Sequence, residues 1–280
     1  MNNLDSVFQA IQDKAEQAAA GRKEHLEADG LLHCDICGEK TQTRITIFDS
    51  ERVVRCICRC TREEMEREEK ERQRQARQLR IQKMRIQGFD KAEMQGWTFE
   101  NDDGALPKIS RAAKMYCDRF EQLKLSGKGL IFYGNVGSGK TYTAACIANE
   151  LISKGVPVLM TNFSRIINRI QASFEGRQEY IDSLNAFDLL IIDDLAAERN
   201  TEFMNETVYT IIDSRYRAGL PLIVTTNISL NEMTNAVELS RQRIYSRILE
   251  RCHPIAVNGT DRRKKAFMTD YADMNNLLGL

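Results

Sequence analysis

The chain has 280 residues, and its 40 lysines and arginines are balanced by 40 aspartates and glutamates, so the formal net charge at pH 7 is zero. A neutral chain offers no overall attraction to nucleic acid, so any such contact must come from a local patch of charge. No apolar run approaches the length of a membrane span, and residues 1–20 lack the apolar core of a secretory signal, so we expect a cytoplasmic protein with no membrane contact.

The N-terminal residues predict a helix over residues 4–19. Apolar side chains recur there at helical spacing, as at Leu4, Phe8 and Ile11. Such a helix either packs on its own domain or docks on a partner, and the pattern allows both.

A cluster of cysteines comes next and predicts a small zinc-binding module. Cys34 and Cys37 form a Cys-x-x-Cys turn, a hairpin is expected over residues 44–54, and three more cysteines follow it. In a reducing compartment such clustering indicates a metal site, and four thiolates around Zn²⁺ can fold a module too small for its own core. Five thiols compete for four places, with His33 a further candidate. Cys34 and Cys37 are predicted ligands, and two of Cys56, Cys58 and Cys60 complete the set.

Residues 61–87 are nearly all helix formers and predict a long charged helix. Glutamates crowd its first half, whereas arginines and lysines fill the second half from Arg72 to Arg85. This order suits the helix dipole and favours a solvated connecting helix, and the alternative is that the basic half contacts nucleic acid or an acidic partner. The expected parts of the chain are an N-terminal module (1–62), the charged helix and linker (63–95) and a main domain (96–280).

From about residue 109 the sequence alternates between helical segments and short apolar runs. The intervening segments are long enough for crossover helices, so we expect an α/β fold with a parallel sheet and right-handed crossovers. Just before it, the segment from Trp97 to Phe99 is apolar enough to require burial. The five strands are expected over residues 128–133, 156–161, 188–192, 222–226 and 254–257.

Residues 134–141 fit the phosphate-binding pattern G-x-x-x-x-G-K-[ST] at every fixed position, between an apolar run and an Ala-rich stretch. Glycines let backbone N–H groups turn toward phosphate oxygens, and the helix N-terminus adds a partial positive charge. Lys140 is expected to reach the β and γ phosphates of ATP, and Thr141 to hold Mg²⁺. The predicted nucleotide-binding residues are Gly134, Asn135, Val136, Gly137, Ser138, Gly139, Lys140 and Thr141.

Two acids follow the third expected strand, at the sheet edge where ligands of open α/β sheets bind. Asp193 is predicted to hold Mg²⁺ opposite Thr141, and Asp194 to orient or deprotonate the attacking water. The fourth strand ends at Asn227, which either hydrogen-bonds the γ-phosphate or the water, or caps the helix that follows.

Arginines near the C-terminus complete the candidate site. Arg247 lies in an amphipathic helix over residues 240–251, where solvated arginines are the ordinary interpretation. It is also the candidate for an arginine presented to a neighbouring subunit's γ-phosphate. The basic run 262–265 either closes over the nucleotide, with Arg263 the candidate, or contacts a nucleic-acid backbone.

The order of these motifs resembles the DnaC/DnaI-type replicative helicase loaders of bacteria and phages, which are AAA+ ATPases of the IstB/DnaC superfamily. The resemblance rests on GNVGSGKT, LLIIDD, TTN and YSRILER within residues 95–265. It implies a five-stranded parallel sheet, a DnaB-type hexameric helicase and single-stranded DNA as partners, self-association on the helicase, and the bacterial cytoplasm as the location. It also implies sensor roles for Asn227 and Arg263 and a finger role for Arg247.

Two other functions are compatible with the same motifs. A transposition helper ATPase of the IstB type shares the ATPase core, although such helpers typically lack a cysteine-rich N-terminus. A nucleotide-switched adaptor that barely hydrolyses ATP is the second, because Asp194 is one methylene shorter than the Glu found in many related ATPases. Hydrolysis is therefore expected to be slow.

Overall fold

The computed structural model divides into two compact units, residues 1–78 and 79–280. It describes residues 12–13, 16–17, 21–47, 50–172, 176–195 and 201–278. Most of the helix predicted over residues 4–19 lies outside these described residues. The three-part division at residues 62 and 95 stays a prediction. No helix within the described residues is long and apolar enough to cross a membrane.

The first unit contains two small antiparallel sheets and the beginning of a long helix. Strand β1 (Glu24–Leu26) pairs with β2 (Leu32–Cys34), and β3 (Gln42–Ile47) pairs with β4 (Ser50–Arg55), which confirms the predicted hairpin. The buried apolar side chains of the described part of this unit are few. Because so small a core supplies little stability, a cross-link such as a metal would be needed to hold the two small sheets together.

Helix α2 (Arg59–Gly88) confirms the long charged helix and begins in the first unit. It ends at Gly88, where an added Cβ would lie 2.7 Å from the carbonyl oxygen of Val158. The next residue, Phe89, forms a parallel bridge with Met160. The close approach at Gly88 therefore lets the chain join the edge of the second unit's sheet directly after the helix.

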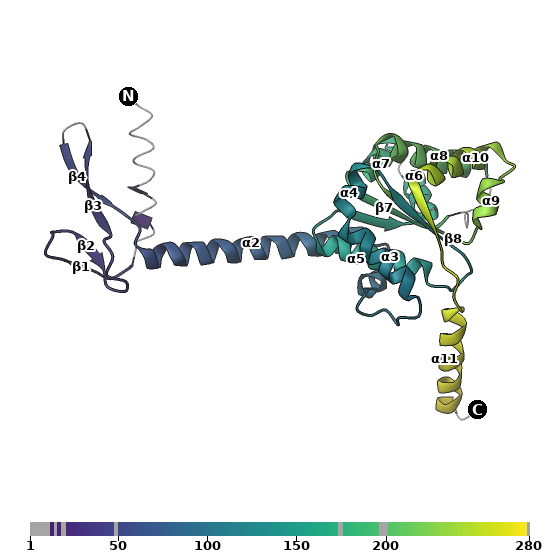
Figure 1. Ribbon diagram of the computed structural model, residues 1–280, viewed down its shortest axis with the longest axis horizontal. Helices are drawn as coiled ribbons and strands as arrows, with labels where there is room; N and C mark the ends of the chain where they lie inside the picture. Colours follow the sequence, from purple (N-terminus) through teal and green to yellow (C-terminus); the bar gives the residue numbers. More distant parts are fainter. Residues whose placement is uncertain are drawn as a thin grey trace. The chain divides into compact units, whose positions relative to one another are not determined.

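The second unit is built on a five-stranded parallel sheet in the order β6-β7-β8-β5-β9. This confirms the predicted parallel α/β architecture. Figure 1 labels two of these strands, β7 and β8, among the helices of this unit. The third expected strand continues further than predicted, to Leu195, and so includes both acids. The strands are β5 (Gly129–Tyr133), β6 (Val158–Thr161), β7 (Leu189–Leu195), β8 (Leu222–Thr226) and β9 (Cys252–Ala256).

Helices pack on both faces of this sheet, because successive residues of its strands point to opposite faces. In β5, Phe132 belongs to one core and Ile131 to the other. The first core contains α3 (Pro107–Asp118), α4 (Phe120–Leu125) and α5 (Lys140–Ser153). The second contains α6 (Phe163–Ala172), α7 (Arg177–Ser183), α8 (Glu202–Arg217), α9 (Leu230–Thr234) and α10 (Leu239–Arg251). Short turns η1 (Ala92–Gly96) and η2 (Leu184–Ala186) and the C-terminal helix α11 (Arg262–Leu278) complete the unit.

The segment before α3 is part of the first core. Phe99 is 9 % exposed, which confirms the expected burial, and Trp97 is partly buried against the same core. The side-chain amide of Asn149, on α5, donates to the carbonyl oxygens of Met94 at 2.8 Å and Trp97 at 2.9 Å. These bonds fix the segment against the helix that begins at Lys140.

One arginine is almost completely buried in the second unit. Arg215, on α8, is 1 % exposed, and its guanidinium donates to the carbonyl oxygens that precede β7 and β8. Burial lowers its pKa to about 10, so the side chain stays charged at neutral pH. The guanidinium therefore satisfies backbone oxygens that would otherwise be buried without partners. The acceptors are Leu184, Phe187, Asp188 and Pro221.

Candidate functional site

The loop 134–139 joins β5 to α5, and its glycines occupy positions where a side chain does not fit. A Cβ at Gly137 (φ 73°) would lie 1.9 Å from Oδ1 of Asp261, and one at Gly134 (φ 136°) would lie 2.5 Å from the carbonyl oxygen of Val257. Positive φ and close packing together require glycine at both positions. The loop after β9 thus packs directly on the predicted phosphate-binding loop.

Lys140 is the first residue of α5, and its ammonium group is held inside the loop. The residue is 7 % exposed, and Nζ donates to the carbonyl oxygens of Gly134 at 2.9 Å and Asn135 at 2.6 Å. It also donates to Oδ1 of Asn227 at 2.8 Å. The sequence predicted these residues for one site, and the structure brings the lysine and the asparagine into contact.

The two acids lie in a β-bulge rather than beyond the end of a strand. Ile192 pairs with Val224, but the next registered pair is Leu195 with Thr226, so two residues of β7 face one residue of β8. Within the described residues, Asp194 is the only non-glycine with positive φ, at 59°. The bulge gives the two acids different backbone orientations.

Hydrogen bonds connect these acids to β8 and to Asn227. The hydroxyl of Thr225 donates to Oδ1 of Asp193 at 2.6 Å and accepts from the backbone N–H of Asp194 at 2.9 Å. The side-chain amide of Asn227 donates to Oδ1 of Asp194 at 3.2 Å. The contacts form a chain from Lys140 through Asn227 to Asp194, as the edge geometry of a parallel sheet allows.

These groups surround a cavity of about 410 Å³. Four lining residues were missed by the sequence reasoning as site residues. Thr225 precedes Asn227 by two, Tyr142 follows Lys140 by two, Arg262 adjoins Arg263, and Trp97 is the chain's single tryptophan. The rings of Trp97 and Tyr142 have centroids 5.8 Å apart. The cavity is lined by Trp97, Val136, Gly137, Ser138, Gly139, Lys140, Thr141, Tyr142, Asp193, Asp194, Thr225, Asn227 and Arg262.

The basic run after β9 contributes Arg262 to this cavity. Its Nη2 forms an ion pair with Oδ1 of Asp103 at 2.9 Å, and its backbone N–H donates to the carbonyl oxygen of Gly137 at 3.1 Å. The side chain of Arg263, the residue predicted from sequence, lies outside the described residues. A role for Arg263 therefore stays a prediction.

Arg247 lies on α10 and is not among the described residues that line the cavity of its own chain. Its Nε donates to Oδ1 of Asp213 at 2.7 Å, and Nη2 donates to the Tyr209 hydroxyl at 2.8 Å. The guanidinium lies over the Tyr209 ring, 4.7 Å from its centroid. The side chain is therefore anchored on α8, and presentation to a neighbouring subunit stays a prediction.

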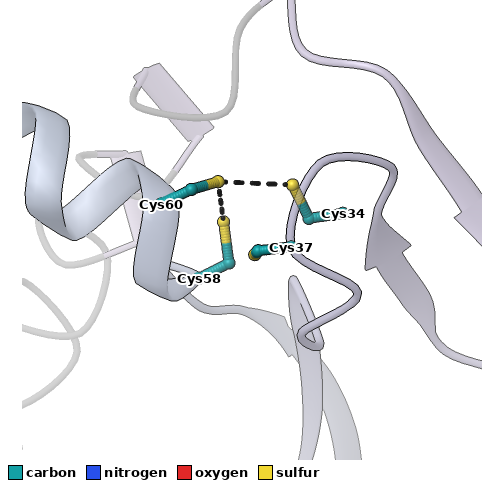
Figure 2. A group of neighbouring side chains, drawn as sticks. All are labelled: Cys34, Cys37, Cys58 and Cys60. Carbon is teal, nitrogen blue, oxygen red and sulfur yellow. Dashed lines mark hydrogen bonds between the residues drawn. The ribbon is translucent and has the colours of Figure 1, made fainter.

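Four cysteines of the first unit converge in a second candidate site (Figure 2). The sulfur of Cys60 lies 3.5 Å from that of Cys34 and 3.4 Å from that of Cys58, and the four sulfurs lie within 4.8 Å of one another. A Zn²⁺ with Zn–S bonds of about 2.3 Å has sulfurs about 3.8 Å apart in a tetrahedron. The donor set of Cys34, Cys37, Cys58 and Cys60 therefore fits zinc in both geometry and chemistry.

The thiols of this cluster have strongly perturbed acidities. Backbone N–H groups of Cys60 and Glu39 lower the pKa of Cys37 to about 6, whereas the hydrogen bond with Cys58 raises the pKa of Cys60 to about 12. Thiols this close cannot all ionise without a cation between them, and a bound metal removes that repulsion.

Cys56 and His33 do not join the four sulfurs, so the candidate ligand set is Cys34, Cys37, Cys58 and Cys60. Cys56 Sγ donates to the carbonyl oxygen of Lys40 at 3.3 Å. The His33 ring contacts the carbonyl oxygen of Gly38 at 3.0 Å and Oδ2 of Asp29 at 3.4 Å. Spacing could not rank Cys56 below Cys58 and Cys60, because the selection depends on where α2 begins.

Comparisons with known proteins bear on the second unit and its cavity. The family described as IstB-like ATP binding protein matches residues 53–269. The chain is 26 % identical to the replicative helicase loader DnaI of Bacillus subtilis over 185 residues, covering 61 % of this chain and 60 % of DnaI. It is 28 % identical to the replicative helicase loader DnaC of Escherichia coli over 162 residues, covering 55 % of this chain and 63 % of DnaC.

An insertion-sequence ATP-binding protein of Mycobacterium tuberculosis is 27 % identical over 184 residues, covering 62 % of this chain and 71 % of that protein. The crystal structure of DnaI superposes with a TM-score of 0.52 at 27 % identity, covering 64 % of this chain and 98 % of that one. The DnaC helicase loader superposes with a TM-score of 0.53 at 23 % identity, covering 60 % of this chain and all of that one, and shows the same fold.

The matches thus cover only part of the helicase loaders, about 60 % of their length. The family match nevertheless covers most of this chain, including the phosphate-binding loop, the acid pair and Asn227. We conclude that the chain has an AAA+ fold and belongs to the IstB-like ATP binding protein family, within which it is similar to the DnaC and DnaI helicase loaders.

Proposed function

We propose that this protein is an ATP-dependent loader of a DnaB-type hexameric helicase, which helps place that helicase on single-stranded DNA. The carrying observation is one cavity that gathers a buried lysine, two carboxylates and Asn227 at the carboxyl edge of a parallel sheet. Similarity to proteins named replicative helicase loaders supports the choice of client. The zinc-type module at the N-terminus supports the choice of a loader over a transposition helper.

In this proposal the loop 134–139 and Lys140 bind the phosphates of ATP. Lys140 would exchange its bonds to backbone oxygens for bonds to the β and γ phosphates, which carry more negative charge. Mg²⁺ fits the same cavity, because Thr141 and Asp193 offer it hydroxyl and carboxylate oxygens, the ligands it prefers. When bound, Mg²⁺ supplies charge neutralisation at the phosphates.

Hydrolysis would use the acid that Asn227 contacts. Water attacks the γ-phosphorus, the bond to the β-phosphate oxygen breaks, and ADP and inorganic phosphate leave. Asp194 would orient that water or accept its proton. Asn227 would hydrogen-bond both Asp194 and the γ-phosphate and so keep the acid aligned with the phosphate. Arg262, from the cavity wall, and Arg263 would stabilise the negative charge of the phosphates.

The cysteine cluster would hold Zn²⁺ and thereby fold the helicase-binding module. One zinc per chain is expected in the purified protein. Cys58→Ser should lose that zinc, because it removes one of the four converging thiolates, whereas Cys56→Ser should retain it. Metal analysis by mass spectrometry on both variants measures this directly. Equal loss of zinc in the two variants would contradict the assigned ligand set.

Self-association on the helicase is the remaining part of the proposal. Arg247 would leave or share its contacts with Asp213 and Tyr209 and reach the γ-phosphate bound by a neighbouring copy. ATP would then favour assembled copies over separate ones, because the triphosphate binds an additional guanidinium in the assembly.

The test mixes the protein with a purified hexameric helicase, ATP and single-stranded DNA. We expect an ATP-dependent complex and faster helicase loading, measured by light scattering and an unwinding assay. Arg247→Ala should bind ATP within about twofold of the wild-type affinity but lose at least about tenfold in loading rate, since a finger acts on the transition state and the assembly.

Arg243→Ala is the matched control, because Arg243 is an exposed arginine on the same helix and its loss removes the same charge. It should load normally. Normal loading by Arg247→Ala would remove the neighbouring-copy part of the proposal, and absence of any helicase complex would remove the loader function itself.

A second candidate function is favoured by one observation, the similarity to insertion-sequence ATP-binding proteins. A transposition helper would bind duplex DNA and a transposase rather than a helicase. Adding duplex DNA and transposase as competing partners in the same light-scattering experiment separates the two functions.

A further inference from the structure

We propose that Thr225 is a positioning residue for the acid pair, and that its hydroxyl sets the geometry of both Asp193 and Asp194. This inference rests on the proposed ATPase function, because it concerns how the same site is assembled. Sequence reasoning gave Thr225 no role, since a threonine near the end of a buried β-strand is ordinary.

Thr225 lies on β8, and the bulge in β7 places both acids opposite it. Between the registered pairs Ile192 with Val224 and Leu195 with Thr226, two acids face this single threonine. Thr225 is 1 % exposed, so its hydroxyl has no access to bulk water and must find partners in the protein. The two hydrogen bonds that its hydroxyl forms both go to residues of the bulged strand.

Both hydrogen-bonding capacities of the hydroxyl are used on the acids. A hydroxyl has one proton to donate and lone pairs to accept with. The proton goes to Oδ1 of Asp193 at 2.6 Å, and a lone pair accepts the backbone N–H of Asp194 at 2.9 Å. One atom therefore links the side chain of the first acid to the backbone of the second.

The two contacts have separate consequences. Fixing one oxygen of Asp193 orients the carboxylate that would hold Mg²⁺, and such supporting bonds typically change metal affinity or activity about 10–100-fold when they are removed. Satisfying the N–H of Asp194 stabilises a left-handed backbone that an L-residue otherwise disfavours. Loss of the hydroxyl would loosen both groups together.

The experiment compares Thr225→Val with Thr225→Ser. Valine has the same shape as threonine without the hydroxyl, and serine keeps the hydroxyl without the methyl group. We expect Thr225→Val to lower the affinity for a divalent ion about 10–100-fold in the presence of ADP, measured by Mn²⁺ titration with electron paramagnetic resonance, and to lower kcat for ATP by a similar factor. Thr225→Ser should stay within about threefold of wild type in both, because the bonds remain.

Two further measurements separate this role from simple damage to the fold. Metal-free ATP binding, followed by fluorescence of Trp97 in the cavity wall, should be unchanged by Thr225→Val, since the loop and Lys140 are intact. Thr207→Val is the matched control, because it removes another buried hydroxyl, bonded to the carbonyl oxygen of Phe203 on α8, and should leave metal affinity and kcat at wild-type values.

Wild-type metal affinity and kcat in Thr225→Val would overturn the inference, as would a serine variant as impaired as the valine variant. These results are distinguishable from failure of the ATPase function. In that case the wild type would show no turnover and no Trp97 response, and Lys140→Ala would be indistinguishable from it.

Discussion

Asp194→Asn is expected to reduce ATP turnover by about 10²–10⁴-fold while ATP binding stays within about twofold of wild type, because a carboxylate that orients or deprotonates water contributes on that scale. Asparagine is the informative substitution at this position. It is tolerated in the left-handed region where Asp194 lies, and its side-chain oxygen can still accept from Asn227. Steady-state phosphate release and Trp97 fluorescence measure the two quantities.

Asp194→Ala provides the comparison for backbone effects. Alanine also removes the carboxylate, but it is less compatible with positive φ, so this variant should lose thermal stability as well as turnover. The asparagine variant should lose only turnover. Unchanged hydrolysis by Asp194→Asn would exclude the acid from the chemistry. Negligible hydrolysis by the wild type would instead favour the nucleotide-switched adaptor.

Arg215→Met is expected to lower the free energy of unfolding of the second unit by about 3–5 kcal/mol, because several buried carbonyl oxygens lose their hydrogen-bond donor and each unsatisfied buried group costs about 1–3 kcal/mol. Methionine fills part of the space but cannot donate, so the carbonyl oxygens of Leu184, Phe187, Asp188 and Pro221 lose a buried partner. Urea unfolding followed by Trp97 fluorescence reports on this unit, because the tryptophan lies within it.

Arg217→Met is the matched control on the same helix. Its side chain is 76 % exposed and forms an ion pair with Asp213. An exposed pair of this kind contributes little, so the control should change stability by less than about 0.5 kcal/mol. Equal effects of the two substitutions would show that the backbone oxygens before β7 and β8 do not depend on the buried guanidinium.

The parts of the molecule that local sequence determines were predicted well. The phosphate-binding loop follows from glycine and lysine spacing, and the five parallel strands follow from short apolar runs separated by helical segments. Both signals depend on residues close together in the chain, which is why no tertiary knowledge was needed. The grouping of Lys140 and Asn227 in one site was predicted too, because parallel strands bring their carboxyl ends to one edge, although their direct contact was not.

The parts that depend on tertiary register were not accessible. Nothing in the sequence distinguishes Cys56 from Cys58 and Cys60, because the difference arises from the turn into α2. From sequence alone, Arg215 is expected to be an exposed charged residue on an amphipathic helix. Its burial depends on loops far away in the sequence. The linking role of Thr225 required the bulge, which periodicity alone does not predict.

The bulge in β7 also has a consequence for how this protein can change over evolutionary time. Ile192 and Leu195, three positions apart, belong to the same core, whereas in a regular strand they would face opposite sides. Deleting a single codon between them would restore the regular alternation but remove one member of the acid pair. We therefore expect insertions and deletions to be excluded from this segment and to accumulate in surface loops, where length is free to drift.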